Sequence, residues 1–180
     1  MDIKVVLSNK DTAYIIRNLF PLFLHDLSEF DGTLPNEHGI LEPAPVQTLV
    51  EQGEIFKNRW ETPNVFFPFL IFVDGRPAGF DLIATQPYAP SSIDYFVHDF
   101  FLLHPYRGKG IGEWAATEVF KKFHGRWEVH VQLNNLRAQA FWRKTIAKYI
   151  SGQFQEEIGR TPLYADDMVI FRFNNREAAP

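Results

Sequence analysis

Three glycines stand within five residues of this chain, and an apolar pattern with helical spacing follows them directly. They are Gly108, Gly110 and Gly112, in the stretch LHPYRGKGIGEWAATEVF over residues 103–120. Glycines between a strand and a helix leave backbone N–H groups free to face a ligand, and the positive end of the helix favours an anion. The sequence therefore predicts an anion-binding loop at this junction.

Three interpretations of this loop compete. The first is a tight turn whose glycines serve geometry alone. The second is a dinucleotide-binding loop, because residues 110–115 fit G-x-G-x-x-A and Glu128 is an acidic residue further on. That motif normally occupies the first strand-to-helix turn of its fold, whereas here a helical region and a hairpin precede it. A P-loop is excluded, since no G-x-x-x-x-G-K-S/T occurs in the chain.

The third interpretation uses the residue before the glycines and a second motif downstream. The segment from Arg107 to Gly112 matches Q/R-x-x-G-x-G/A, and residues 135–142 match N-x-x-A-x-x-L/F-Y except at the last position. In a helix, Asn135, Ala138 and Trp142 share one face. In this order, the two motifs resemble the GNAT superfamily of acetyl-CoA-dependent N-acetyltransferases. The resemblance covers roughly residues 3–173.

The resemblance implies a mixed α/β fold, with a central and mostly antiparallel sheet of about seven strands, flanked by about four helices and splayed at the acetyl-CoA site. It implies acetyl-CoA as cosubstrate, with the pyrophosphate on the glycine loop and Arg107 either near the phosphate or bracing the loop. A backbone N–H near residues 101–103 would polarise the thioester carbonyl. The residues expected to bind the cofactor are Phe101, Leu102, Leu103, Arg107, Gly108, Lys109, Gly110, Ile111, Gly112, Asn135, Ala138, Phe141 and Trp142.

The chain departs from the family pattern at Trp142, where the family usually has a tyrosine that protonates the departing thiolate. An indole N–H donates a hydrogen bond but does not titrate usefully, so we expect Trp142 to serve packing and cofactor contact. Tyr149 lies two turns further along the same expected helix, about 10 Å away, which is too far for direct substitution. The absence of cysteine removes the commonest acyl-enzyme route and favours direct attack by the amine.

Two residues are candidates for the general base that deprotonates the amine, Asp99 and His130. Strand alternation puts His98 and Asp99 on opposite faces, so only one of them is expected to face the cleft. His25 and Glu29, among aromatic residues of the first helix, are candidates for binding a cationic acceptor. The histidine spacings fit neither helical nor strand metal ligation, so no metal is expected.

Composition supports a single enzyme-sized domain. The chain has 180 residues with 46% hydrophobic residues, a net charge of −4 and no cysteine. We expect one domain over residues 1–173 and a flexible tail over residues 174–180. The negative charge argues against a nucleic-acid partner, and no apolar run is long enough to span a membrane. We expect a cytoplasmic protein whose partner is a small-molecule or peptide amine, with a homodimer as one option for its assembly.

The expected elements run in the order β-α-α-β-β-β-α-β-α-β-β. Pro21 is expected to kink or end the first helix, and Asp74-Gly75 predicts a hairpin turn. Three functions follow from these observations. The first is an N-acetyltransferase that transfers acetyl from acetyl-CoA to a primary amine within a ternary complex. The second is a catalytically weak acyl-CoA-binding sensor, and the third is a nicotinamide-dependent oxidoreductase.

Overall fold

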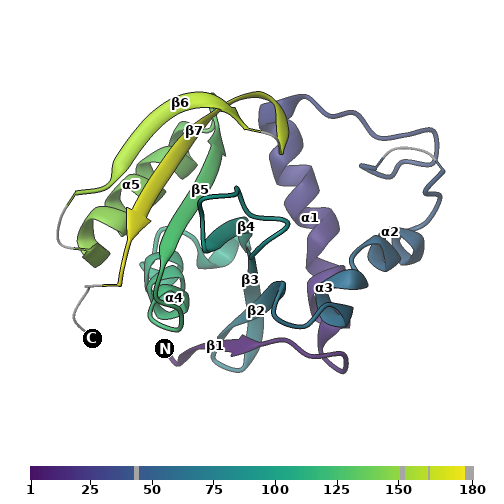
Figure 1. Cartoon of the computed structure of the whole chain (residues 1–180). Coiled ribbons are helices and arrows are strands. Elements are labelled where there is room, and N and C mark those ends of the chain that lie inside the picture. The colour runs from purple at the N-terminus through teal and green to yellow at the C-terminus, as the bar shows by residue number, and fades with distance from the viewer. Residues whose placement is uncertain (43–44, 151–152, 162, 177–180) are drawn as a thin grey trace.

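The computed structural model describes residues 1–42, 45–150, 153–161 and 163–176. Within these residues the chain forms seven strands, four longer helices, the single turn α3 and a short 3₁₀ turn (Figure 1). In chain order the helices and strands are β1 (Ile3–Leu7), α1 (Ala13–Asp31), α2 (Leu49–Ile55), α3 (Asn58–Glu61), β2 (Phe66–Val73), β3 (Arg76–Ala84), β4 (Tyr95–Leu102), α4 (Ile111–Phe120), β5 (Arg126–Gln132), α5 (Leu136–Ile150), β6 (Gln155–Thr161) and β7 (Tyr164–Asn174). This order and the mixed α/β class confirm the predicted fold.

All seven strands belong to one sheet, in the order β1-β2-β3-β4-β5-β7-β6. Every neighbouring pair is antiparallel except β4 and β5. The β2–β3 hairpin turns at Asp74 and Gly75, whose φ angles of 49° and 74° suit that residue pair. A parallel pair needs a long crossover, and α4 supplies it between β4 and β5.

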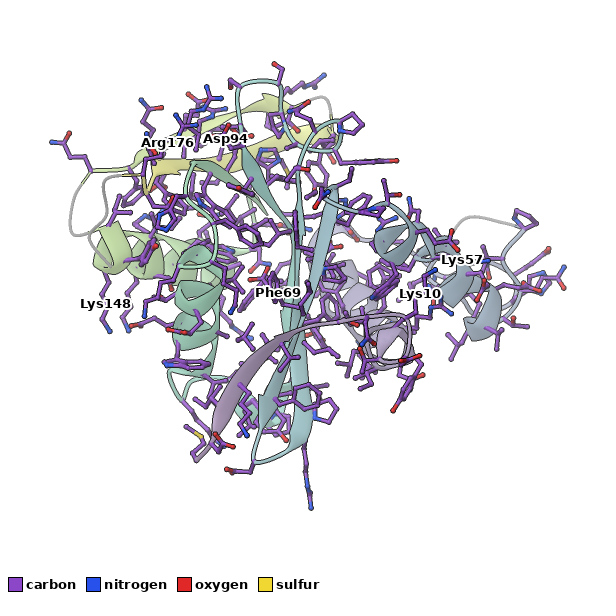
Figure 2. All side chains as sticks on the ribbon, turned by 60° about the horizontal axis from the view of Figure 1, so that its bottom comes forward. Lys10, Lys57, Phe69, Asp94, Lys148 and Arg176 are labelled. Carbon is purple, nitrogen blue, oxygen red and sulfur yellow. The ribbon has the colours of Figure 1, made fainter. Side chains whose placement is uncertain are left out.

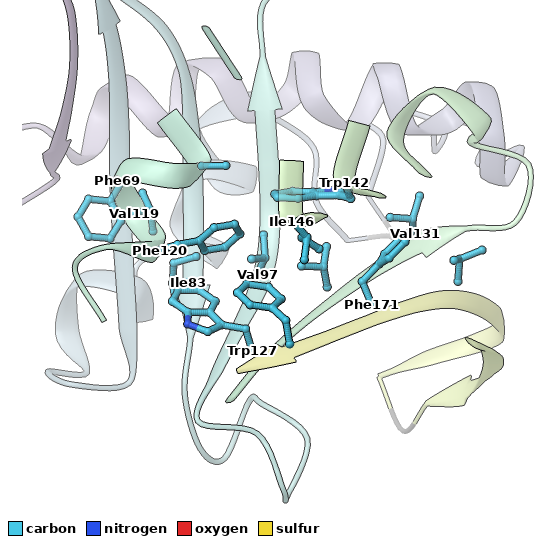
Figure 3. Close-up of a cluster of buried hydrophobic side chains, with 14 residues drawn as sticks. Phe69, Ile83, Val97, Val119, Phe120, Trp127, Val131, Trp142, Ile146 and Phe171 are labelled. Atoms are coloured by element: carbon cyan, nitrogen blue, oxygen red, sulfur yellow. The ribbon is translucent and has the colours of Figure 1, made fainter. Parts of the chain in front are cut away.

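The helices cover both faces of the sheet. On one face α4 and α5 pack over an aromatic core that contains Phe120, Trp127 and Trp142 (Figure 3). On the other face α1 packs against Phe80 and Phe101. Phe69, near the middle of the sheet in Figure 2, belongs to the first of these cores.

Helix α1 continues past the proline that was expected to kink or end it, so Pro21 does not end the helix. Pro21 lies inside α1, which continues to Asp31. Proline removes one backbone hydrogen bond, but the buried residues Ile16, Phe20 and Phe23 hold both halves of the helix against the sheet. Tertiary packing of this apolar face therefore outweighs the local cost of the proline.

Strands β4 and β5 separate soon after they begin. Their parallel pairing joins Tyr95–Val97 to Trp127–Val129 and goes no further, although both strands continue. The backbone of β4 beyond residue 97 therefore faces a gap on its β5 side. This is the splay that the resemblance implied, and it places the end of β4 beside the glycine loop that follows it.

The ordered part of the chain extends two residues beyond residue 173, where the sequence predicted that the domain ends. Asn174 ends β7, and Asn175 is fully buried, although both were assigned to the flexible tail. The Oδ1 of Asn175 accepts a hydrogen bond from Gly125 at 2.8 Å. Next to it Asp94 binds Arg126 and Arg176, and the hydrogen bond from Arg126 lowers the pKa of Asp94 to about 2 (Figure 2). Residues 177–180 lie outside the described part.

No helix among the described residues is long and apolar enough to cross a bilayer.

Candidate active site

A cavity of about 410 Å³ opens between α1, the end of β4, the glycine loop and α5. Three successive residues of β4, Phe100, Phe101 and Leu102, form one wall. The remaining lining residues that bear on its chemistry are Asp26, Glu29, Arg107, Gly108, Gly110, Gly112, Glu113, Asn135, Arg137, Ala138, Phe141, Lys144 and Thr145. The cavity thus gathers both sequence motifs in one place.

The glycine loop presents backbone amides to this cavity. Gly108 and Gly110 have φ angles of 71° and 77°, a conformation that side chains disfavour, and Gly110 is the N-cap of α4. Trp114 is the first residue of α4 whose N–H is bonded, to Gly110 O at 3.0 Å. The preceding N–H groups of the first turn therefore have no acceptor in the helix and stand at its positive end.

Gly112 serves a different purpose from the other two glycines. A Cβ at this position would come within 3.2 Å of Cε2 of Phe141 and 3.6 Å of Cε1 of Phe100. The missing side chain lets α4, α5 and β4 meet closely at the base of the cavity. The pairing of Gly112 and Phe141 thus links the two sequence motifs through space.

The free edge of β4 offers further amides at the splay. Leu103 N donates to Ala78 O on β3 at 2.8 Å, so its amide is not available to a ligand. In an antiparallel strand alternate residues direct their N–H groups to opposite edges. The amides of Leu102 and Phe100 therefore point toward the gap between β4 and β5. Of the three residues expected to bind the cofactor through this strand, Leu102 directs its amide to the gap, and so does Phe100, which was not among them.

Helix α5 contributes polar groups from its first half. Oδ1 of Asn135 accepts from the N–H of Ala138 at 3.0 Å and so caps the helix. Asn135 lines the cavity, and its side-chain nitrogen has no hydrogen-bond partner in the described chain. Thr145 lies two turns after Ala138 on the same face, and its buried Oγ1 also has no partner there. Both groups are available to a ligand, and an unpaired buried hydroxyl gains most from one.

Arg107 braces the loop rather than facing outward from it. Its Nε donates to Leu102 O at 2.6 Å, and its guanidinium pairs with Asp26 of α1. The Asp26 carboxylate also lies 3.3 Å from Nε2 of His104. Of the two roles left open for Arg107, these contacts support the bracing one, because they tie the glycine loop to α1 across the cavity.

The charges around the cavity leave one cation without an acidic partner. Lys144 and Lys148 both bind Glu113, and these hydrogen bonds lower the pKa of that carboxyl, so it is ionised at neutral pH. Arg137, in the first turn of α5, makes no ion pair in the described chain. Together with the amides of α4, it gives this wall the donors that a pyrophosphate needs.

Beyond the cavity, a bulge in β4 brings two titratable side chains together. Leu82 pairs with Asp99 and the next residue, Ile83, pairs with Val97, so His98 is an extra residue on β4. Because a bulge breaks strand alternation, Nδ1 of His98 reaches Oδ2 of Asp99 at 2.9 Å. The expectation that these two side chains lie on opposite faces was wrong for this reason.

His130 lies at the splay but is engaged elsewhere. It is the first residue of β5 after the last β4–β5 pair. Its side chain is fully buried, and Nε2 binds Glu128, which also binds Arg172. Burial raises the pKa of Glu128, but its hydrogen bonds to His130 and Arg172 outweigh this and lower it below its usual value. Nδ1 of His130 is buried without a partner.

Several residues expected at the site lie outside the cavity wall. Ile111 and Trp142 belong to the core, where the Trp142 ring meets Phe100 at 5.2 Å. Lys109 folds back to bind Pro105 O at 2.7 Å. His25 does not line the cavity, whereas Glu29 does. Leu103 does not line the cavity either. The other expected cofactor residues line it: Phe101, Leu102, Arg107, Gly108, Gly110, Gly112, Asn135, Ala138 and Phe141.

Other residues of the wall carried no sequence signal strong enough to single them out. Thr145 continues the spacing of Asn135 and Ala138 along one helix face, which is the signal that could have identified it. Asp26 and Arg137 lie on elements that meet only in the folded chain. Among the described residues, no group of three or more His, Asp or Glu side chains is arranged to hold a metal ion.

The comparisons with known proteins identify the chain as an acyltransferase. The family model described as the acetyltransferase (GNAT) family matches residues 34–146, more than half of the chain, and the chain belongs to this family. No curated protein is significantly similar to it in sequence.

Solved structures agree in fold at low sequence identity. An acetyltransferase from Thermus thermophilus is 17% identical, with 97% of each chain covered and a TM-score of 0.64. The ribosomal-protein-S5-alanine acetyltransferase from Vibrio fischeri is 20% identical over 100% of this chain and 97% of its own, with a TM-score of 0.64. AAC(6')-Ib, in a complex with ribostamycin and coenzyme A, is 16% identical over 99% and 96%, with a TM-score of 0.67.

Proposed function

We propose that this protein is an N-acetyltransferase that transfers the acetyl group of acetyl-CoA to a primary amine by direct attack in a ternary complex. The observation that carries the proposal is the single cavity that joins the first-turn amides of α4 to the free edge of β4. One end suits a pyrophosphate and the other suits an extended amide-bearing arm. We treat residues 1–173 as one acetyltransferase domain, extended by the buried Asn175.

In this proposal the cofactor-binding groups have distinct tasks. The amides of α4 and Arg137 bind the pyrophosphate, while Asn135 and Thr145 donate to the arm that follows it. The amides of Phe100 and Leu102 pair with the arm and polarise the thioester carbonyl, as preorganised donors do. Acetyl-CoA itself supplies the activated acyl group.

Asp99 is the base that we favour for the acceptor amine. It is linked to His98, it lies on β4 beside the splay, and its side chain keeps 13% of its surface exposed. Proton removal from an amine needs a group that the amine or a bridging water can reach. His130 meets this requirement less well, because its side chain is 0% exposed and bound to Glu128.

The proton for the departing thiolate has no evident donor on α5. Trp142 packs in the core and carries no titratable group. Oη of Tyr149 receives a hydrogen bond from Asn175 at 3.2 Å, away from the cavity wall. A thiolate is a fair leaving group near its own pKa, so we infer that it leaves without direct protonation by the protein.

The acyl-CoA sensor remains the second candidate, and Trp142 in place of the family's tyrosine is the observation that favours it. Both candidates predict acetyl-CoA binding at the same loop. The oxidoreductase has lost its support, since the glycine loop follows β4 rather than the first strand, and the chain belongs to an acetyltransferase family.

Calorimetric titration with acetyl-CoA tests the loop, and release of free thiol with a panel of amines tests transfer. Gly110→Asp should reduce binding by at least about a hundredfold, through positive-φ strain and a negative charge facing the pyrophosphate. The matched control is Gly39→Asp, at a loop glycine with the same φ of 77° outside the cavity. Equal binding by both variants would refute the loop assignment, and binding without thiol release would favour the sensor.

A further inference from the structure

A half-buried cation lies near Asp99 without a carboxylate partner. Arg59, in α3, has its guanidinium carbon 4.8 Å from the ring centre of Phe56 and 5.0 Å from that of Phe66. Nη1 donates to Oδ1 of Asn58 at 2.7 Å, and the buried Nε has no hydrogen-bond partner in the described segments of the chain. Arg59 makes no ion pair within the part of the chain that the structure describes. A desolvated guanidinium without an anion is costly, and a ligand anion would offset that cost.

Arg59 and Asp99 belong to the same patch of the sheet face that carries α1. The ring of Phe66 connects them: it lies 6.4 Å from the ring of His98, which hydrogen-bonds Asp99. Tyr88 packs on the same Phe66 ring at 4.6 Å and is 41% exposed. The patch is therefore open to solvent at one side and apolar at its centre.

The charges within this patch are complementary but do not pair directly. Burial lowers the pKa of Arg59, and the negative charge of Asp99 partly offsets that effect. Arg59 remains a cation, since guanidinium groups do not lose their proton in proteins. The patch thus presents one anion and one cation, separated by the Phe66 ring, to anything that enters from the solvent side.

We propose that Arg59 binds a carboxylate of the acceptor, so that the acceptor is an amine that also carries a carboxylate, as an amino acid does. This inference rests on the proposed function, because it assigns the amine end of the acceptor to Asp99. A planar guanidinium matches a carboxylate in shape and charge. A phosphate dianion fits less well, because a single arginine would leave one of its charges uncompensated near Asp99.

The test compares ω-amino acids of increasing chain length with alkylamines of the same length as acceptors. For the best length, the wild type should show a kcat/KM at least about tenfold higher for the amino acid, as one charge-assisted hydrogen bond predicts. Arg59→Gln should make kcat/KM for the amino acid similar to that for the alkylamine, mainly by raising the KM for the amino acid. The affinity for acetyl-CoA should not change. Arg59→Lys keeps the charge and should retain part of the preference.

Arg17→Gln is the matched control. Arg17 also stacks on an aromatic ring, that of Trp60 at 5.8 Å, but it is already paired with Glu54 and lies away from Asp99. This variant should keep the full preference for the amino acid. A wild type that prefers alkylamines at every length, or an Arg59→Gln protein that keeps the preference, would overturn the inference while leaving acetyl transfer intact.

A binding experiment separates this inference from the proposed function. Thermal shifts of the acetyl-CoA complex with each ligand pair measure recognition without turnover. If no amine is acetylated, yet the amino acids stabilise the wild type and not Arg59→Gln, the transferase proposal fails and the carboxylate site stands. If neither member of any pair stabilises either protein and none is acetylated, both proposals fail.

Discussion

At the scale of single residues, the proposed chemistry depends on how Asp99 is held. His98 binds one oxygen of its carboxylate at 2.9 Å, and the other oxygen has no hydrogen-bond partner in the part of the chain that the structure describes, so an amine or a water molecule can approach it. This arrangement exists because His98 is an extra residue in β4, which turns two consecutive side chains toward each other. The pair therefore depends on a backbone irregularity as much as on residue type.

Asp99→Asn should lower kcat by about a hundredfold to ten-thousandfold, because an amide keeps the shape but does not accept the amine proton. The affinity for acetyl-CoA should stay unchanged, since Asp99 does not line the cavity. Steady-state rates and calorimetric titration measure the two effects. Asp11→Asn, at an exposed residue near the start of α1, is the control. An unchanged kcat would move the role of base to His130 or to water.

Asp81 carries a second carboxyl group, and its burial makes the stability of the protein depend on pH. It is fully buried in β3, and neither oxygen has a hydrogen-bond partner among the described residues. Burial raises its pKa well above the usual value, and the charge of Asp99 raises it further. The folded protein therefore retains a proton that the unfolded chain releases above about pH 4.

Stability should accordingly fall as pH rises from about 4 toward the raised pKa of Asp81, by up to about 1.4 kcal/mol per pH unit from this group. Asp81→Asn removes this contribution, so its free energy of unfolding should fall less steeply with pH than that of the wild type. Urea unfolding at a series of pH values gives both slopes. Parallel slopes would show that Asp81 is not protonated in the folded protein.

How far the sequence predicted these residues depends on how local their signals are. The glycines and Asn135 were predicted because each needs only a short motif on one element. The contact between His98 and Asp99 was not predicted. The sequence of β4 is compatible both with regular strand alternation and with a bulge at His98. The ion pair between Asp26 and Arg107 was not predicted for another reason, since the two residues lie 81 positions apart in the chain.

At the scale of elements, the close approach of β3 to β4 positions the cavity wall. Gly79 on β3 lies opposite Leu102, and a Cβ there would come within 2.0 Å of Phe101 O. Because that atom belongs to the backbone, no side-chain rotation relieves the clash. The β4 edge that faces the cavity therefore depends on a glycine in the neighbouring strand.

Gly79→Ala should destabilise the protein by about 2 kcal/mol or more and weaken acetyl-CoA binding, because β4 must shift to accept the methyl group. The matched control is Gly159→Ala in β6, where a Cβ would meet its nearest neighbour, Ile170, at an ordinary 3.8 Å. Denaturant unfolding and calorimetric titration provide the two measurements. Equal stability of the two variants would contradict this account of the β3–β4 contact.

The types of the elements followed well from the sequence, while some of their ends did not. Alternation predicted β5, and the Asp74-Gly75 pair predicted the β2–β3 hairpin, because both are local signals. Pro21 does not end α1, which was one of the two outcomes predicted for it, because its local cost is smaller than the gain from burying the residues on both sides of it. Packing against the sheet, which no local pattern contains, decides such cases.

At the scale of the whole molecule, the end of the chain joins the end of α4 to the start of β5, where β5 is still paired with β4. The Nδ2 of Asn175 donates to Phe120 O and Phe123 O at 2.9 Å, and its Oδ1 accepts from Gly125. One side chain thus satisfies the end of α4 and the segment that leads into β5. The predicted flexible tail began at residue 174 and so did not include this contact. Two consecutive polar Asn residues near a chain end are typical of a frayed terminus.

Asn175→Ala should lower the free energy of unfolding by about 2–4 kcal/mol, because it leaves the buried N–H of Gly125 and the carbonyl of Phe123 without the partners that Asn175 provides. Asn174→Ala, at the exposed neighbouring residue, should change it by less than about 0.5 kcal/mol. Denaturant titration of both variants compares them directly. A small effect at Asn175 would return the domain boundary to residue 173.

The chain belongs to the acetyltransferase (GNAT) family, and we propose where acetyl-CoA binds and reacts in it. A crystal structure of the acetyl-CoA complex tests this proposal most directly. We expect the pyrophosphate at the first-turn amides of α4, the arm along Phe100 and Leu102, and the thioester at the splay on the side of Asp99. A pyrophosphate bound away from the glycine loop, or a thioester directed away from the gap between β4 and β5, would contradict the account.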